Sequence, residues 1–191
     1  LGSLIYSVAV GTESERLAAL RRQADIYIIN RENVCWLVDY YRNDWPFDMV
    51  VVDESSSFKN AQSKRFKALK LVRPRIRRLV ELTGTPSPNG LEDLWAQVYL
   101  LDGGARLGKT ISSYREAFFT EDRAYPGQQY RTYSPQDGAD RRIREAISDI
   151  CVSMKAEDYL TLPDYTEDIV PVVLDAKAKR AYDRLERDML L

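Results

Sequence analysis

The stretch Met49-Val50-Val51-Val52-Asp53-Glu54 decides the fold of this chain. Its apolar residues do not alternate with polar ones, which predicts a central strand that is buried on both faces of a sheet. Apolar segments of strand character alternate with helical patterns on either side of it. The sequence therefore predicts an α/β fold in which a parallel sheet carries helices on both faces.

The predicted elements follow one another regularly through the first half of the chain. Strands are expected over 4–10, 25–30, 47–53 and 77–82, and helices over 14–22, 33–41, 61–72 and 91–101. After Gly103 the pattern changes to a short helix over 114–120, a long loop over 121–140 and a helix over 141–150. The last part is expected to hold strands over 151–154 and 166–174, a turn over 160–164 between them, and a charged helix from Ala176.

The composition limits the classes of protein to which the chain can belong. Its 191 residues, 45% of them apolar, suffice for one sizeable core and a smaller appendage. A net charge of −1 and a pI near 5.7 argue against a surface that binds nucleic acid everywhere, so any DNA contact is regional. Two distant cysteines and no histidine exclude the usual zinc sites and histidine-based triads. No apolar run could span a bilayer and no signal sequence opens the chain, which predicts a soluble, cytoplasmic protein.

Two adjacent carboxylates, Asp53 and Glu54, follow directly on the predicted central strand, in the form of a Walker B element. An aspartate at this place can hold magnesium, and the neighbouring glutamate can polarise the water that attacks the γ-phosphate of a nucleotide. An acidic pair at the end of a strand can also be a solvated turn or a helix cap. The pair therefore needs a second signal before it indicates a nucleotide site.

That second signal is the string Leu82-Thr83-Gly84-Thr85-Pro86, which ends the next predicted strand. Strands so ordered in a parallel sheet can lie side by side, which would bring two hydroxyls near the carboxylate pair. Gly84 and Pro86 can also form a turn, with Asn89 as the cap of the following helix, and both interpretations can hold together. The two strings in this order are much more specific than the acidic pair alone.

These strings and their surroundings resemble the Swi/Snf-type ATPases of helicase superfamily two. Asp53 to Ser56 resembles helicase motif II, and Leu82 to Pro86 resembles motif III. Motif Ib, the Lys-Asn after motif II and the helix after motif III have counterparts in Ile28-Ile29-Asn30-Arg31-Glu32, in Phe58-Lys59-Asn60, and in Asn89 with Leu91 to Trp95. The similarity is to bacterial and phage members and runs from about Val8 to the end of the chain.

The resemblance implies a RecA-like fold that hydrolyses ATP with Mg²⁺ and moves on duplex DNA. It gives catalytic roles to Asp53, as metal ligand, and to Glu54, as general base. It gives the coupling of nucleotide state to DNA binding to Thr83, Gly84 and Thr85, and contacts with DNA to Asn30, Arg31, Lys59 and Asn60. It also divides the chain into a partial first RecA-like domain over 1–111, a helical and irregular protrusion over 112–165, and a last strand with the start of a linker helix over 166–191.

Two departures from the family pattern bear on activity. Ser55 and Ser56 stand where the family has Gly or Ala followed by His, so coupling at this position is expected to differ. Nothing before Asp53 matches the phosphate-binding P-loop, Gly-x-x-x-x-Gly-Lys-Ser/Thr. We therefore expect a RecA-like sheet that is incomplete at its N-terminal side, a second RecA-like domain outside the chain, and no ATP hydrolysis by the isolated chain.

A P-loop expression does occur later, over Gly103-Gly104-Ala105-Arg106-Leu107-Gly108-Lys109-Thr110. A working P-loop leaves a strand and opens a helix, so that backbone N–H groups converge on phosphate. This stretch instead follows the predicted helix over 91–101 and comes after the acidic pair. A nucleotide-binding protein that uses Lys109 stays open as an alternative function.

A basic stretch over 59–78 offers a further alternative. It holds nine cations and no acidic residue: Lys59, Lys64, Arg65, Lys67, Lys70, Arg73, Arg75, Arg77 and Arg78. Such a run can neutralise phosphates and bind DNA in a salt-dependent way. It can also be a solvated helix face whose apolar residues, Phe66, Leu69 and Val72, turn to the core. A non-enzymatic DNA-binding module therefore stays open as well.

Overall fold

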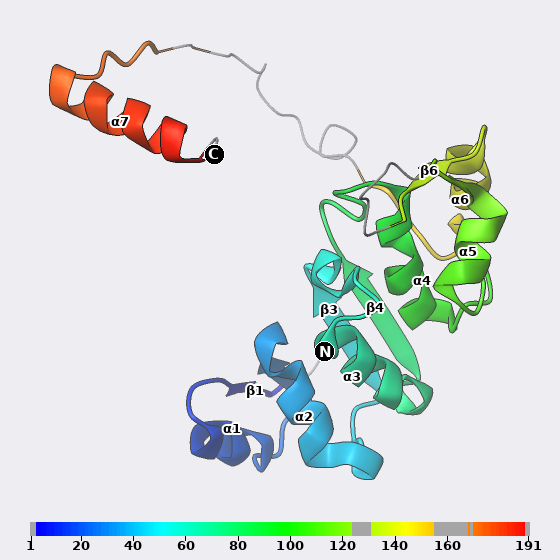
Figure 1. Ribbon diagram of the computed structural model, residues 1–191. Coiled ribbons are helices and arrows are strands. Elements are labelled where there is room, and N and C mark those ends of the chain that lie inside the picture. The colour runs from blue at the N-terminus through cyan, green and yellow to red at the C-terminus, as the bar shows by residue number, and fades with distance from the viewer. Residues whose placement is uncertain (1–2, 124–130, 155–167, 169, 190–191) are drawn as a thin grey trace. The chain divides into compact units, whose positions relative to one another are not determined.

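The computed structural model describes residues 3–123, 131–154, 168 and 170–189 (Figure 1). The chain forms two compact units, Leu1–Cys151 and Val152–Leu191. In the second unit the one described element is helix α7 (Ala176–Met189), which confirms the charged helix predicted from Ala176. No helix in the described ranges is long and apolar enough to cross a membrane.

The first parallel sheet lies at the N-terminal end of the first unit. It consists of β1 (Tyr6–Ala9) and β2 (Ile26–Ile29), which are connected by helix α1 (Glu13–Leu20). A capping box starts α1, because the Thr12 hydroxyl accepts from the Glu15 N–H while the Glu15 carboxylate accepts from the Thr12 N–H. One face of the sheet packs against α1 and α2 (Val34–Tyr41) in a small apolar core.

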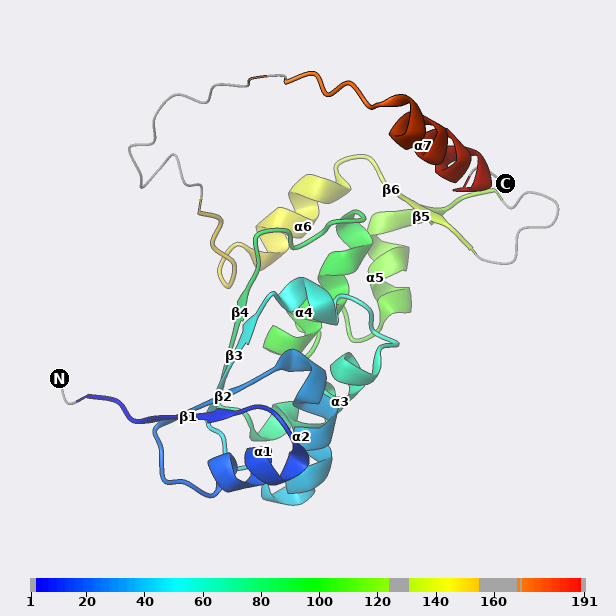
Figure 2. The same ribbon diagram turned by 90° about the vertical axis from the view of Figure 1, so that its left-hand side faces the viewer.

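The second parallel sheet consists of β3 (Met49–Asp53) and β4 (Arg78–Leu82), and helix α3 (Lys64–Val72) connects the two strands. Short 3-10 helices complete the connections: η1 (Arg31–Asn33), η2 (Arg42–Asp44), η3 (Ser55–Phe58), η4 (Arg73–Arg75) and η5 (Leu91–Asp93). In Figure 2 the helices α3 and α4 (Leu94–Asp102) lie on the same side of this sheet.

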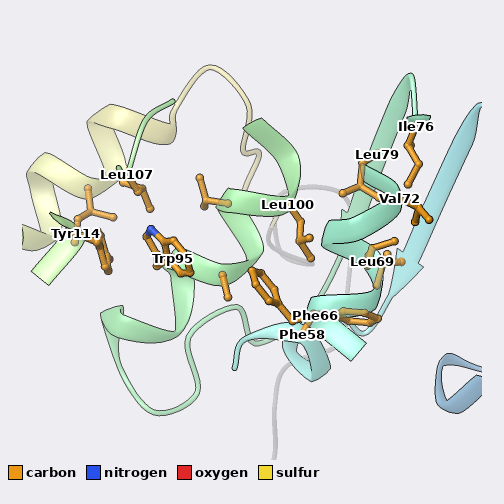
Figure 3. Packing of buried hydrophobic residues seen from close by; sticks show 14 of the residues in the cluster. Phe58, Phe66, Leu69, Val72, Ile76, Leu79, Trp95, Leu100, Leu107 and Tyr114 are labelled. Carbon is orange, nitrogen blue, oxygen red and sulfur yellow. The ribbon is translucent and has the colours of Figure 1, made fainter. Parts of the chain in front are cut away.

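The large core of the first unit fills the space between the β3–β4 sheet and these helices. Figure 3 shows side chains of one continuous cluster that runs from Ile76 and Leu79 through Phe66 and Leu100 to Tyr114. Helix α5 (Ile111–Phe118), the antiparallel strands β5 (Phe119–Glu121) and β6 (Tyr133–Pro135), and helix α6 (Ala139–Ile147) follow α4. Tyr114, Phe119 and Ile143 join the same cluster, so α5, β5 and α6 pack on the core that covers the sheet.

The structure corrects the prediction of helices on both faces of the sheet. Val51 is 53% exposed, Met49 is 52% exposed and Leu82 is 50% exposed, whereas Val52 and Leu79 on the opposite face are buried. The same alternation holds in the first sheet, where Tyr6, Val8, Ile26 and Ile28 are exposed. In the described part of the chain each parallel sheet therefore has one covered face and one apolar face in water.

Most predicted elements are present, and the main differences lie after Gly103, where the end of the helix predicted over 114–120 forms β5. The strand predicted over 151–154 is wrong, and the described residues of the strand predicted over 166–174 are not in a strand either. Part of the loop predicted over 121–140 forms β6, and α5 begins three residues before the predicted helix. The turn predicted over 160–164 lies outside the described residues.

Candidate active site

The carboxyl ends of β3 and β4 meet at one edge of their sheet, as the sequence predicts. The parallel register pairs Asp53 with Leu82, so that Glu54 and Thr83 are the next residues on the two neighbouring chains. Neighbouring strands in a sheet are about 4.8 Å apart. The structure thus brings together the acidic pair and the hydroxyl string, and we call Asp53–Ser56 with Thr83–Pro86 the carboxyl edge.

The backbone turns sharply at Glu54. This residue has φ 54° and ψ 54°, a left-handed conformation that costs a residue with a Cβ atom about 1–2 kcal/mol. The Glu54 N–H donates to Oδ1 of Asp53 at 3.1 Å, and both side chains are exposed. Two carboxylates are therefore accessible to a ligand at the end of a strand whose last apolar residue, Val52, is buried.

The hydroxyl string forms a local turn opposite the acidic pair. Oγ1 of Thr83 accepts from the N–H of Thr85 at 3.2 Å, and Thr83 is half-buried. Gly84 and Thr85 are exposed, and a Cβ added to Gly84 would meet no atom within 4 Å. Gly84 therefore has open space beside it at this edge.

A buried glutamine connects the two strings. Ser55 is 1% exposed, and its hydroxyl donates to Oε1 of Gln97 at 3.0 Å. Gln97 lies on α4 and is 4% exposed; its Nε2 donates to the carbonyl oxygens of Pro86 at 2.6 Å and of Asp93 at 3.0 Å. Gln97 is absent from the residues predicted from the sequence, although a single polar residue within the apolar run 94–101 is a signal that could have found it.

A second buried polar group lies one residue below the edge, on β4. Glu81 pairs with Val52 in the register, and its Oε1 is buried without a hydrogen-bond partner among the described residues. Burial raises the pKa of Glu81 to about 8, although the nearby Ser55 hydroxyl and the Arg73 guanidinium oppose the shift. A pKa of about 8 favours the neutral form of Glu81 at neutral pH, close to the residues that follow Glu54.

The residues predicted to contact DNA lie in two different environments. Asn30 and Arg31 follow β2 and are exposed, and Nε of Arg31 pairs with Oε1 of the neighbouring Glu32 at 3.2 Å. Lys59 instead forms a partly buried ion pair, with Nζ 3.1 Å from Oδ2 of Asp93. Oδ1 of Asn60 accepts from the N–H of Gln62 at 2.8 Å, so Lys59 and Asn60 both have partners within the chain.

The basic stretch over 59–78 contains both internal and exposed cations. Arg73 donates to the carbonyl oxygens of Leu100, Leu101 and Ile76, and so caps the C-terminal end of α4. Nζ of Lys70 lies 4.6 Å from the centroid of the Tyr99 ring. Six exposed members of the stretch form no ion pair with a described residue: Lys64, Lys67, Lys70, Arg75, Arg77 and Arg78. The interpretation as a solvated helix face holds for α3, since Phe66, Leu69 and Val72 are buried.

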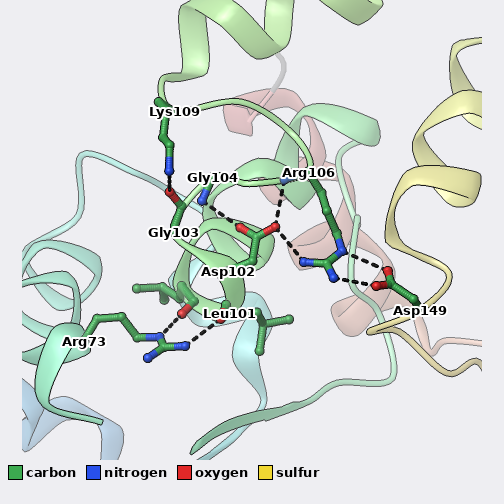
Figure 4. Close-up of polar contacts among 9 residues, drawn as sticks. Arg73, Leu101, Asp102, Gly103, Gly104, Arg106, Lys109 and Asp149 are labelled. Carbon is green, nitrogen blue, oxygen red and sulfur yellow. Dashed lines mark hydrogen bonds and ion pairs between the residues drawn. The ribbon is translucent and has the colours of Figure 1, made fainter. Parts of the chain in front are cut away.

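The P-loop expression over Gly103–Thr110 has a different geometry from a phosphate loop (Figure 4). It follows helix α4, which Gly103 ends in a left-handed conformation, and not a strand. The Asp102 carboxylate accepts from the N–H groups of Gly104 at 2.7 Å and Arg106 at 2.9 Å, while Nζ of Lys109 donates to the Gly103 carbonyl at 3.0 Å. A carboxylate of the chain itself thus occupies N–H groups that a P-loop would offer to phosphate.

The loop is also tied to its surroundings on both sides. Nε1 of Trp95 donates to the Gly108 carbonyl at 3.0 Å, and Nε of Arg106 donates to Oδ1 of Asp149 at 2.8 Å. The Arg106 guanidinium holds the pKa of Asp149 below its usual value. These contacts give the stretch a structural role in joining α4 to α5 and α6, and nothing in its geometry supports the alternative function that uses Lys109.

The carboxyl edge also satisfies the chemical requirements for magnesium. In the described part of the chain no group of three or more His, Cys, Asp or Glu side chains could hold a metal ion by itself. Magnesium bound with a nucleotide does not need such a cage, because one or two carboxylates together with phosphate oxygens and water complete its coordination. The exposed carboxylate of Asp53 fits that requirement.

Comparisons with known proteins identify relatives over nearly the whole chain. The family profile described as SNF2-related domain matches residues 6–191. Protein p41 of Acyrthosiphon pisum secondary endosymbiont phage 1 is 36% identical over 188 residues, which is 95% of this chain and 41% of that protein. Helicase swr1 of Emericella nidulans is 40% identical over 60 residues, which is 31% of this chain and 3% of that protein.

Among solved structures, the Sulfolobus solfataricus SWI2/SNF2 ATPase core in complex with dsDNA is similar with a TM-score of 0.48 and 26% sequence identity. The match covers 60% of this chain and 23% of that chain. The chain spans less than half of the length of the curated relatives that it matches.

Proposed function

The chain belongs to the family of SNF2-related domains, and from this premise we propose that it is part of the first RecA-like domain of a DNA-dependent ATPase. The observation that carries the proposal is the register of β3 and β4, which places the Asp53-Glu54 pair beside the Thr83-Gly84-Thr85 string. Ligands of open α/β sheets bind at the carboxyl ends of the strands, where this edge lies.

In the proposed site Asp53 is the ligand of magnesium and Glu54 is the general base. Magnesium bound with ATP would neutralise charge on the phosphates and help to orient them. Asp53 is suited to hold it because its carboxylate is exposed and its backbone is fixed in a paired strand. Glu54 follows in a conformation that turns the chain away from the strand, and its exposed carboxylate can accept a proton from an attacking water.

Thr83, Gly84 and Thr85 are proposed to couple the state of the nucleotide to DNA binding. They lie beside the acidic pair and belong to a turn whose following segment reaches α4 through the Gln97 contact with Pro86. Two hydroxyls at this place can respond to the charge and the hydrogen bonds of bound nucleotide. A shift of the string would then be transmitted to the helix that follows it.

Duplex DNA is the proposed partner, with Asn30 and Arg31 as the residues that contact it. Both are exposed at the carboxyl end of β2, and they correspond to motif Ib of the family that the chain resembles. Lys59 and Asn60 belong to the same proposal, but their polar groups already bond to Asp93 and to the Gln62 N–H. We therefore expect a larger loss of DNA binding from Arg31→Ala than from Lys59→Ala, whose first effect is on stability.

The test of this function is a steady-state ATPase assay with and without duplex DNA. It requires a polypeptide in which this chain is joined to a P-loop segment and a second RecA-like domain, because residues 1–52 hold no P-loop expression. We expect hydrolysis that DNA stimulates and that Asp53→Asn abolishes, and no hydrolysis by the 191-residue chain alone. A joined protein that hydrolyses ATP equally well with Asn at position 53 would contradict the proposal.

Filter binding at rising salt distinguishes a motor from a DNA-binding module without enzymatic activity. A module that uses the basic stretch would bind DNA with an affinity that falls steeply as the salt concentration rises. Lys64→Ala and Lys67→Ala should make this salt dependence shallower, because each lost contact with a phosphate reduces the slope. The proposed function instead expects the slope to fall with Arg31→Ala. Loss of slope only in the α3 variants, without ATP hydrolysis, would favour the module.

A further inference from the structure

The side chain of Gln97 occupies an unusual place in the core. It lies on α4 among buried apolar neighbours such as Ala96 and Val98. Two of its three hydrogen bonds reach other segments of the chain, and the third goes to the carbonyl of Asp93 at the start of α4. One bond reaches Ser55, directly after Glu54, and another reaches Pro86, directly after Thr85. We propose that Gln97 is a positioning residue that holds the general base and the coupling string in one fixed relation.

The hydrogen bonds of Gln97 leave little freedom for either string. Both N–H groups of Nε2 are used, for the carbonyls of Pro86 and Asp93, and Oε1 accepts from the Ser55 hydroxyl. At 4% exposure water cannot replace these partners, so a broken bond leaves a buried polar group unsatisfied at a cost of about 1–3 kcal/mol. The amide therefore favours a single arrangement of the two segments.

A second contact holds the other end of the same turn. Oδ2 of Asp93 pairs with Nζ of Lys59 at 3.1 Å and accepts from the N–H of Asn89 at 3.0 Å. Ser55 opens η3 and Lys59 follows its end, so both ends of η3 are attached to residues 93 and 97, which are four positions apart at the start of α4. The turn after Glu54 and the segment after Thr85 are thus attached to one rigid helix.

This arrangement gives a physical reason for the departure from the family pattern at Ser55. The family has Gly or Ala at this position followed by His, and neither Gly nor Ala could donate a side-chain hydrogen bond to Gln97. The chain has no histidine, and the Ser55 hydroxyl supplies a link between the two strings that needs none. The inference rests on the proposed function of the carboxyl edge, because the relative position of the two strings affects the rate of ATP hydrolysis only if the edge is the catalytic site.

The experiment compares Gln97→Met with Val98→Ala in the ATPase assay of the joined polypeptide. Methionine keeps the length of glutamine without its hydrogen-bonding groups, and Val98 is a buried neighbour on the same helix, at 3% exposure, that forms no side-chain hydrogen bond. Gln97→Met should lower kcat roughly 10- to 100-fold, as expected for a displaced catalytic group, with an unchanged KM for ATP. Val98→Ala should lower the melting temperature but leave kcat as it is, measured well below the transition.

A double-mutant cycle with Ser55→Ala tests whether the two residues act together. Because the bond between them is lost in either variant, the double variant should be no slower than Gln97→Met alone. Independent losses that multiply, or a kcat of Gln97→Met equal to that of Val98→Ala, would overturn the proposal.

Failure of the proposed function would look different, since Glu54→Gln would then be as active as the parent protein or the parent would be inactive. The positioning can still be measured in that case by amide hydrogen exchange on the 191-residue chain. Exchange should rise in both 53–58 and 83–86 for Gln97→Met and in neither for Val98→Ala. Equal exchange in the two variants would reject the positioning role.

Discussion

The carboxyl edge and the loop Gly103–Thr110 both carry strings that are typical of nucleotide sites, but they use their polar groups in opposite ways. At the carboxyl edge Asp53 and Glu54 are exposed, and among the described residues only the Glu54 N–H donates to either side chain. In the loop, Lys109 donates to the Gly103 carbonyl, and the N–H groups of Gly104 and Arg106 donate to the carboxylate of Asp102, the last residue of α4. The difference teaches that a motif binds phosphate only where the surrounding elements leave its polar groups accessible.

The two regions also differ in which residues take left-handed backbone conformations. In the loop these positions belong to Gly103, Gly104 and Gly108, which have no Cβ atom. At the carboxyl edge the position belongs to Glu54. A conformation that costs free energy and is kept by a residue with a side chain is typical of functional sites, because the side chain is needed there.

The largest effect that can break this comparison is on ATP hydrolysis. In the joined polypeptide Glu54→Gln should lower kcat by about 10²- to 10⁴-fold, because it removes the proposed general base without changing the shape of the side chain. Lys109→Ala should leave the rate unchanged, since its ammonium group bonds to the Gly103 carbonyl. A steady-state assay on both variants decides, and a severe loss with Lys109→Ala would restore the loop as a nucleotide site.

The next effect is on stability and compares one glycine from each region. Gly104 has φ +82°, and an added Cβ would lie 2.5 Å from the Gly108 carbonyl oxygen, so Gly104→Ala should cost about 2 kcal/mol or more. Gly84 has open space and no positive φ, so Gly84→Ala should stay within about 0.5 kcal/mol. Urea unfolding of the 191-residue chain measures both changes. Equal losses of stability would show that the Gly108 carbonyl does not approach Gly104 as closely as described.

The pH dependence of stability should have opposite signs in the two regions. Burial raises the pKa of Glu81 from 4.5 to about 8, so its contribution is fully present below pH 4.5 and is lost as the pH rises to about 8. Glu81→Gln should remove that decline, which is followed as the melting temperature between pH 5 and 9. Arg106 lowers the pKa of Asp149. The contribution of the Asp149 carboxylate to stability is therefore present at neutral pH and is lost as the pH falls through the lowered pKa.

Asp149→Asn is the matched variant for this contrast. Asp149→Asn should lower the melting temperature at neutral pH and leave it unchanged under strongly acidic conditions. Glu81→Gln should change the melting temperature most above pH 8. Melting curves of Glu81→Gln that run parallel to those of the parent chain at every pH would contradict the buried state of Glu81.

The smallest effect compares the backbone cost at Glu54 with the same cost in the loop. Glu54→Gly should be more stable than Glu54→Ala by about 1 kcal/mol, because glycine relieves the left-handed conformation while both variants lose the carboxylate. Gly103→Ala should lose a similar amount, since Gly103 has φ +67° and open space around an added Cβ. Thermal unfolding of the three variants provides the measurement, and an advantage of alanine at position 54 would show that this turn is not left-handed.

The two strands of the carboxyl edge could be predicted because the apolar runs that form them are local. The order of the two strings indicates that these strands can lie side by side, and the structure adds the register that pairs Asp53 with Leu82. The exposed face of β3 could not be predicted in the same way, because a run of four apolar residues does not tell which of its faces is covered. Val51 and Val52 are residues of the same type. They differ in exposure because the helices pack on the face of the sheet where Val52 lies.

The contacts that hold the edge in place depend on residues far apart in the sequence. Ser55 and Gln97 are 42 positions apart, and Lys59 and Asp93 are 34 positions apart, so no local pattern links them. Each position alone has a simpler interpretation: a serine after a turn, or a lysine in a basic run. The roles of Asp53, Glu54, Thr83 to Thr85 and the candidate DNA contacts, and the domain boundaries drawn from the sequence, stay predictions.

The uncovered faces of the two parallel sheets affect the tendency of the chain to aggregate in solution. Met49, Val51 and Leu82 present apolar area to water on one sheet, and Tyr6, Val8, Ile26 and Ile28 do so on the other. In the described part of the chain each of these sheets has two strands, so their outer edges also offer backbone groups to any passing strand. Exposed apolar faces and unpaired strand edges together favour aggregation. The chain on its own should therefore be kept at low temperature and low concentration.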